Sequence, residues 1–322
     1  MKIVMAVNDV VHMNECGLPL NAIEWLETHH QSKAYEREQM IRDLAIRKEC
    51  FVVDAGCGPG LWTPLLARAI GPRGHIVGVD ISPEALVTAQ GRSANHWYRH
   101  QVEYKRALLE ELPIPQGRAD LIFSANVSQY LPDPVSTFAA MGPYLMQGGR
   151  LAIKDIDFGT MRFHSIDAGL QARVLQARED WEFQRVDRGY TYEDSWVGSK
   201  LAGYLRKAGY EDVREIAYPI RRSAPLPTNF RFYLQGIAEW FVSEDAPFLC
   251  DNDVRDWLRS FRDGPENALD KADFQSEEIE YIVIGTWNKP SSRSLHSVDM
   301  YIELPHTESI EEQEPLVLCP TF

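Results

Sequence analysis

Positive charge is scarce in this sequence. Its 33 lysines and arginines stand against 47 aspartates and glutamates, which gives a formal net charge of −14 over 322 residues. The average surface of such a chain repels a phosphate backbone. The nearest approach to a basic patch, Arg221 and Arg222 with Arg231, is sparse and is interpreted as a solvated face. Nucleic acid is therefore not expected as a partner.

Cysteines and long apolar runs are also few. The five cysteines are scattered and form no CxxC pair or Cys/His cluster with metal spacing, so neither a metal site nor a disulfide framework is expected. No stretch approaches the roughly 20 apolar residues that span a bilayer. Polar residues interrupt positions 1–20, where a signal peptide would be apolar. A cytoplasmic protein without a membrane span is the expectation.

Short apolar runs alternate with helix-like segments through the first half of the chain. Helices separate the runs, and this alternation predicts a parallel sheet that is covered on both faces. The expected strands are Phe51–Asp54, His75–Asp80, Val102–Tyr104, Ala119–Ser124 and Gly149–Asp155, with two more at Val213–Tyr218 and Ile279–Trp287.

Three glycines follow the first expected strand at positions 56, 58 and 60. Glycine permits positive φ and lets backbone N–H groups approach a ligand at a helix N-terminus. The dinucleotide pattern GxGxxG would need a glycine where Leu61 stands, so a nicotinamide or flavin cofactor is disfavoured. Asp80 ends the second strand, where a carboxylate can accept hydrogen bonds from both hydroxyls of a ribose. The alternative is a purely structural turn, with Asp80 only capping the next helix.

These stretches resemble the class I S-adenosylmethionine (SAM) dependent methyltransferases, within the small-molecule branch related to ubiquinone and menaquinone synthesis. The resemblance covers roughly residues 30–160 and implies SAM as the cofactor and methyl transfer as the activity. The matching segments are Val53–Thr63, Val77–Ser82, Glu111–Pro113, Ala119–Phe123 and Gly148–Leu151.

The resemblance also implies roles for single residues. Asp54 would approach the methionine amine, Asp80 would bind the ribose, Ile81 would line the adenine and Asn126 would lie near the methionine moiety. Leu108 stands where the family often has an acidic residue, so adenine contacts there would come from backbone or apolar groups. The full predicted cofactor set is Asp54, Gly56, Gly58, Gly60, Trp62, Asp80, Ile81, Ala107, Leu108 and Asn126.

The resemblance and the element order together predict an α/β fold. We expect a Rossmann-like, doubly wound, seven-stranded sheet, mostly parallel with an antiparallel last strand, and helical lid insertions. The predicted ranges are a helical cap (1–49), the SAM-binding core (50–160, continued at 191–218), helical insertions (161–190 and 219–278), a last core strand (279–288) and a polar acidic tail (289–322).

Methyl transfer from a sulfonium needs mainly alignment, so no catalytic residue is obligatory. For an acidic acceptor a general base would help, and His164 and Asp157 are the predicted candidates, with Gln129, Tyr130 and Asp155 as others. A surface or helix-capping histidine is the alternative for His164.

Three functions remain open at this point. The first is methylation of a small, apolar or aromatic metabolite at oxygen, nitrogen or carbon. The second is a SAM-binding enzyme that catalyses a rearrangement or cyclisation without methylating. The third is methylation of protein or RNA. The expected partner is a small-molecule substrate, and a homodimer is kept open as an assembly. Aromatic residues of the insertions either wall a substrate pocket or form plain core: Trp181, Phe183, Tyr190, Tyr192, Tyr233, Trp240 and Phe241.

Overall fold

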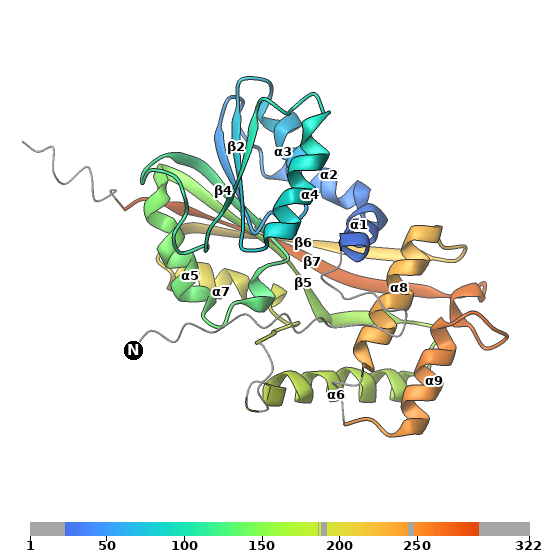
Figure 1. Ribbon diagram of the computed structural model, residues 1–322. Helices are drawn as coiled ribbons and strands as arrows, with labels where there is room; N and C mark the ends of the chain where they lie inside the picture. The colour runs from blue at the N-terminus through green and yellow to red at the C-terminus, as the bar shows by residue number, and fades with distance from the viewer. Residues whose placement is uncertain (1–22, 186, 188–191, 244–247, 290–322) are drawn as a thin grey trace, which may run out of the picture.

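The computed structural model describes residues 23–185, 187, 192–243 and 248–289, and within these ranges seven strands form one sheet (Figure 1). The strand order is β3-β2-β1-β4-β5-β7-β6. β7 runs antiparallel to both of its neighbours, whereas the other pairs are parallel. The strands are β1 (Phe51–Ala55), β2 (His75–Asp80), β3 (Val102–Arg106), β4 (Ala119–Ala125), β5 (Leu145–Phe163), β6 (Glu211–Ser223) and β7 (Gln275–Trp287). The predicted fold class is confirmed.

Helices cover both faces of this sheet. On one face, α2 (Ala34–Asp43) and α3 (Thr63–Ile70) pack on alternate strand residues such as Val52. On the other face, α5 (Pro134–Met141) and α7 (Leu201–Lys207) pack on their neighbours, such as Val53. Because successive strand side chains point to opposite faces, strands buried on both sides are apolar throughout.

Local sequence signals explain where the helices of the core begin. Ser82 accepts a hydrogen bond from the backbone N–H of Ala85 and caps α4 (Pro83–Ala94), which packs on β2 and β3. Asp133 caps α5 in the same way by accepting from the N–H of Ser136. Proline stands in the first turn of both helices, where its missing N–H leaves no helical hydrogen bond unmade.

Beyond the glycine loop, β5, β6 and β7 continue as a three-stranded extension of the sheet. Cα pairing links Arg162 to Glu277 and Arg222 to Ser276, so the extension reaches the far ends of these strands. The sequence predicts that β5 ends at Asp155 and that β7 begins at Ile279, so both predicted strands are too short. When the sequence is considered alone, charged residues such as these are typical of loops. They form strands here because they pair with each other.

Four helices pack around this extension and share an apolar core of their own. They are α1 (Ile23–Ser32), α6 (Ala168–Arg185), α8 (Thr228–Phe241) and α9 (Asp251–Phe261). Figure 1 shows α6 and α9 below the long strands and α8 crossing them beside α1. The side of the molecule beyond the glycine loop is thus built jointly by the N-terminal helix and the two insertions.

Two features are absent from the described part of the chain. No helix there is both long and apolar enough to cross a bilayer. No group of three or more histidine, cysteine, aspartate or glutamate side chains there could hold a metal ion. Residues 1–22, Tyr190 and all but the first residue of the expected acidic tail lie outside the described ranges.

Candidate cofactor site

The glycine loop after β1 has the backbone conformation that its sequence predicts. Gly56, Gly58 and Gly60 all have positive φ, at 72°, 51° and 74°. The N–H groups of Gly56 and Cys57 both donate to the carbonyl of Val79, which fastens the loop to β2. A Cβ at Gly58 would have no heavy atom within 4 Å. The loop is therefore held from one side, and its Gly58 side is open to a ligand.

Asp80 joins the end of β2 to this loop. One carboxylate oxygen accepts from the backbone N–H of Gly58 at 2.8 Å, and the other accepts from the N–H of Ser82 at 2.9 Å. Each carboxylate oxygen has a further lone pair, and the side chain is only partly buried. Asp80 therefore both shapes the loop and keeps the capacity to accept hydroxyl groups.

Asp54 lies at the end of β1, beneath the loop, with 1% of its surface exposed. Its carboxylate accepts a hydrogen bond from the hydroxyl of Thr63 at 3.3 Å. Burial raises the pKa of Asp54 to about 7, with the Thr63 bond acting against this and the charge of Asp80 adding to it. Few contacts stabilise the ionised form of this buried carboxyl group, so a nearby cation would favour that form.

Two exposed apolar side chains follow β2 and β3. Ile81 is 46% exposed and Leu108 is 55% exposed. Two hydrogen bonds hold their loops together, because the Ala107 N–H donates to the carbonyl of Asp80 and the Arg106 side chain donates through Nε to the carbonyl of Ile81. The structure thus offers an apolar surface next to the Asp80 carboxylate, as a flat heteroaromatic ring requires.

Trp62 is placed differently from the rest of the predicted set, since it is 6% exposed and belongs to the core beneath α2 and α3. Its ring lies edge-on to Phe123 at 5.0 Å and to His30 at 5.3 Å between centroids. Its contacts link the glycine loop to the N-terminal helices.

The loop after β4 is held by two neighbouring residues of β5. Asn126 has φ of +59°, and its side-chain oxygen accepts from Lys154 Nζ at 2.6 Å. The N–H of Ser128 donates to the Asp155 carboxylate at 2.9 Å. Burial raises the pKa of Asp155 to about 6, while Lys154 acts to lower it. Asn126 is therefore fixed from β5 at the edge of the site.

The structure does not bring His164 to this loop. Its ring is half exposed, with Nε2 3.2 Å from a Glu277 carboxylate oxygen. It follows Lys154 by ten residues and lies just past the end of β5, and ten residues correspond to roughly 32–34 Å of fully extended chain. β5 runs further than its sequence suggested and separates His164 from the loop after β4, and a role for His164 as a base stays a prediction.

Asp157 pairs with Ile279 at the end of the first paired stretch of β5, where the register shifts. It is buried, and its carboxylate accepts from the N–H of Gly159 at 3.0 Å. This contact stabilises a local turn of the strand. Of the other candidates, Gln129 is buried and Tyr130 is 45% exposed in the short helix η1 (Ser128–Tyr130).

The aromatic residues of the insertions divide between core and surface. Trp181, Tyr233, Trp240 and Phe241 are buried, and the last three belong to the core around the extended strands. Phe183 is 77% exposed. The core interpretation is therefore the correct one for the four buried residues.

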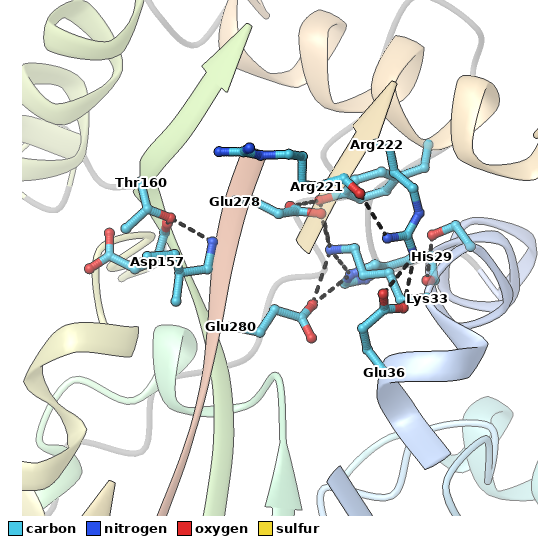
Figure 2. Close-up of polar contacts among 12 residues, drawn as sticks. His29, Lys33, Glu36, Asp157, Thr160, Arg221, Arg222, Glu278 and Glu280 are labelled. Carbon is cyan, nitrogen blue, oxygen red and sulfur yellow. Dashed lines mark hydrogen bonds and ion pairs between the residues drawn. The ribbon is translucent and has the colours of Figure 1, made fainter. Parts of the chain in front are cut away.

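A buried ionic cluster on β7 escaped sequence-based prediction. Lys33 contacts carboxylate oxygens of Glu278 and Glu280 at 2.8 and 3.0 Å, and Figure 2 shows its ammonium between them. Arg37 and Lys154 also pair with Glu280. Burial acts to raise the pKa of Glu280, but the three cations outweigh it and hold that pKa well below its usual range. The sequence signal was that Glu278 and Glu280 lie two positions apart, which places both side chains on one face of a strand.

Comparison with known proteins supplies the family. Residues 46–201 match the family model described as a methyltransferase domain. Residues 46–201 form a methyltransferase domain. This match agrees with the methyltransferase domain that the sequence predicts.

Individual relatives of this methyltransferase domain act on different molecules. Trans-aconitate 2-methyltransferase of Azoarcus sp. is 37% identical over 134 residues, which are 40% of this chain and 50% of that protein. Ubiquinone biosynthesis O-methyltransferase of Xylella fastidiosa is 29% identical over 62% of this chain and 76% of its own. The chain therefore spans about half the length of the Azoarcus relative.

A solved structure supports the fold. A Bacillus halodurans protein assigned as a methyltransferase superposes with a TM-score of 0.51 and 15% identity, covering 78% of this chain and 99% of its own. The likeness concerns the fold alone.

Proposed function

We propose that this chain is a SAM-dependent methyltransferase that acts on a small organic molecule. The observation that carries the proposal is the combination of the open Gly58 face, the Asp80 carboxylate and the buried Asp54 carboxylate at one edge of the sheet. A ligand that carries two ribose hydroxyls and an ammonium group complements both carboxylates.

Five of the predicted residues have tasks that fit their surroundings. Asp80 would accept the ribose hydroxyls, while Ile81 and Leu108 would flank the adenine with their exposed side chains. Asp54 would face the ammonium of the methionine end, with Asn126 nearby. When bound, the cofactor supplies a methyl group that is already activated on a sulfonium.

What the chain itself contributes is orientation and shielding from water. Alignment of donor and acceptor alone lowers the barrier by about 7 to 11 kcal/mol in favourable cases. The loop after β4 is held rigidly by Lys154 and Asp155, so it offers a fixed wall to both reactants. Helices α1, α6 and α8 cover the extended strands, which keeps solvent from that side.

The choice of a small acceptor rests on charge and on the relatives. A net charge of −14 disfavours RNA as an acceptor. The printed names of relatives include ubiquinone biosynthesis and demethylmenaquinone methyltransferases, which supports an apolar or aromatic acceptor. The acceptor atom is left open between oxygen, nitrogen and carbon.

Calorimetry with S-adenosylhomocysteine (SAH) tests the cofactor site. Asp80→Asn should weaken binding by about 10- to 100-fold, because a hydrogen bond to a charged group is worth about 1.5–3 kcal/mol. Asp120→Asn is the matched control, since Asp120 also accepts a backbone N–H, that of Phe51, but stands at the start of β4 instead of a strand's C-terminal end. Equal affinity of wild type and Asp80→Asn would refute the ribose contact.

A product search tests the activity. The protein is incubated with SAM and a metabolite extract, and mass spectrometry follows SAH and products heavier by one methylene. SAH formed in step with such a product is the expected result. If no extract yields either, the methyltransferase proposal fails.

A further inference from the structure

Lys154 is a lysine with no solvent-exposed surface, in the middle of β5. Its Nζ lies 2.6 Å from the Asn126 side-chain oxygen and 3.0 Å from a Glu280 carboxylate oxygen. A buried ammonium is costly unless it is paired, so both contacts matter to it. Lys154 therefore stands between the loop after β4 and the ionic cluster on β7.

The other side of Glu280 belongs to the N-terminal helices. Lys33, in the junction between α1 and α2, contacts Glu280 at 3.0 Å, and Arg37 in α2 binds it through both terminal nitrogens. Figure 2 shows Lys33 and His29 reaching Glu280 from the helix pair. Tyr233 from α8 receives a hydrogen bond from the same Lys33 at 3.0 Å. One carboxylate thus holds three cations from two separate parts of the chain.

This sharing sets how strongly Glu280 attracts Lys154. With α1 and α2 in place, Lys33 and Arg37 also pair with the Glu280 carboxylate, and Lys154 donates a hydrogen bond to Asn126. Without Lys33 and Arg37, Lys154 would be the only one of these three cations left beside Glu280. The carboxylate would then draw the Lys154 ammonium away from the loop after β4. Burial and then the charge of Arg37 lower the pKa of Lys154 to about 7, which also weakens its hold on Glu280.

The conformation of Asn126 depends on its contacts with Lys154. It holds a positive φ, which is uncommon for residues other than glycine and is stabilised by its surroundings. Its backbone N–H donates to the carbonyl of Lys154 itself at 2.8 Å. Both polar ends of Asn126 thus depend on one residue of β5.

We propose that Lys154 is a positioning residue that couples the seating of the α1–α2 helix pair on Glu280 to the placement of Asn126 at the cofactor site. The inference rests on the proposed function, in which Asn126 lies near the methionine end of SAM. It assigns to the helix pair a part in cofactor binding, although neither helix belongs to the glycine loop or its strands.

Hydrogen exchange of the full chain, measured by mass spectrometry with and without SAH, tests the coupling. In the wild type, SAH should slow exchange in peptides from residues 23–43. Lys154→Met should bind SAH about tenfold more weakly, and saturating SAH should no longer slow exchange in those peptides.

Arg150→Met is the matched control. Arg150 also lies on β5 and reaches the end of α2, where it donates to the carbonyls of Leu44 and Ala45. It makes no contact with Asn126, so this variant should keep wild-type SAH affinity and the slowed exchange even if its melting temperature falls.

Asn126→Gly provides a second variant, because glycine accepts the positive φ and only the side-chain contact is lost. It should lose the SAH effect on residues 23–43, and adding Lys154→Met should cause no further loss of affinity. If either single variant keeps the full effect of SAH on the helix pair, the coupling is refuted while the proposed function stands. Failure of the wild type to bind SAH would instead overturn the proposed function.

Discussion

SAH binding should tighten as the pH rises, because the Asp54 carboxyl must be ionised to pair with the ligand's ammonium. Burial raises the pKa of this group to about 7 in the free protein. An adjacent ammonium favours the charged form, so binding lowers that pKa and releases a proton. Affinity is therefore reduced wherever Asp54 is protonated beforehand.

The size of the effect follows from that pKa. If only the ionised form binds, the ionised fraction is about one tenth at pH 6 and about three quarters at pH 7.5, so the dissociation constant should fall roughly eightfold between them. The measured range stops at about pH 7.5, so that the ligand's α-amino group stays mostly protonated throughout.

Calorimetry across this range provides the measurement, with Asp54→Asn as the test variant. The amide cannot ionise, so its dissociation constant should be weaker than wild type and nearly independent of pH. Asp120→Asn should keep the wild-type slope. A wild-type dissociation constant that is flat over this range, or an unchanged slope in Asp54→Asn, would refute the assignment of Asp54.

Ionisation of Asp54 favours ligand binding but lowers the stability of the folded state. The folded pKa lies above the unfolded value of about 3.9, so its contribution to stability is fully present below the unfolded pKa and is lost as the pH rises through about 7. The difference amounts to about 4 kcal/mol at most. Without ligand, Asp54→Asn should therefore be more stable than wild type at about pH 8, as measured by urea unfolding.

Three further outcomes follow from individual contacts. Gly56→Ala should destabilise the fold by several kcal/mol in urea unfolding, because its φ is +72° and the new Cβ would lie 2.4 Å from a Val127 methyl; a melting point equal to wild type would contradict this. His164→Ala should keep turnover within about twofold, since the ring is half exposed and lies just past the end of β5; a loss of a hundredfold would support a role as a base. Glu280→Ala should cost about 3–5 kcal/mol by leaving buried cations unpaired, whereas a cost below about 1 kcal/mol would show that the cluster is not maintained in solution.

Much of the core could be predicted from the sequence, because it depends on interactions between residues that are close in sequence. The glycine loop was foreseen because positive φ at Gly56, Gly58 and Gly60 depends on the residue type itself. The positions of the first five strands followed from alternating apolar runs, and the Asp80 position from its place at a strand end. Each of these signals lies within about thirty residues, the length of one strand–helix–strand unit.

Other features depended on partners that are distant in sequence. The ends of β5 and β7 were misjudged because charged residues such as Arg162 and Glu277 become strand residues only through their pairing with each other. The position of His164 depends on the same pairing, since its distance from the glycine loop is set by how far β5 extends. The aromatic residues of the insertions were ambiguous until packing placed four of them in the interior.

The cofactor class is thus a property of the sequence by itself, since the loop and its acidic partner are local patterns with a fixed geometric meaning. The ionic cluster is a property of the tertiary structure alone. Lys33 and Glu280 lie 247 positions apart, and Lys154 joins them from a third segment. A buried charge is tolerated only where another segment brings its counter-charge, and no pattern within one segment can specify that encounter.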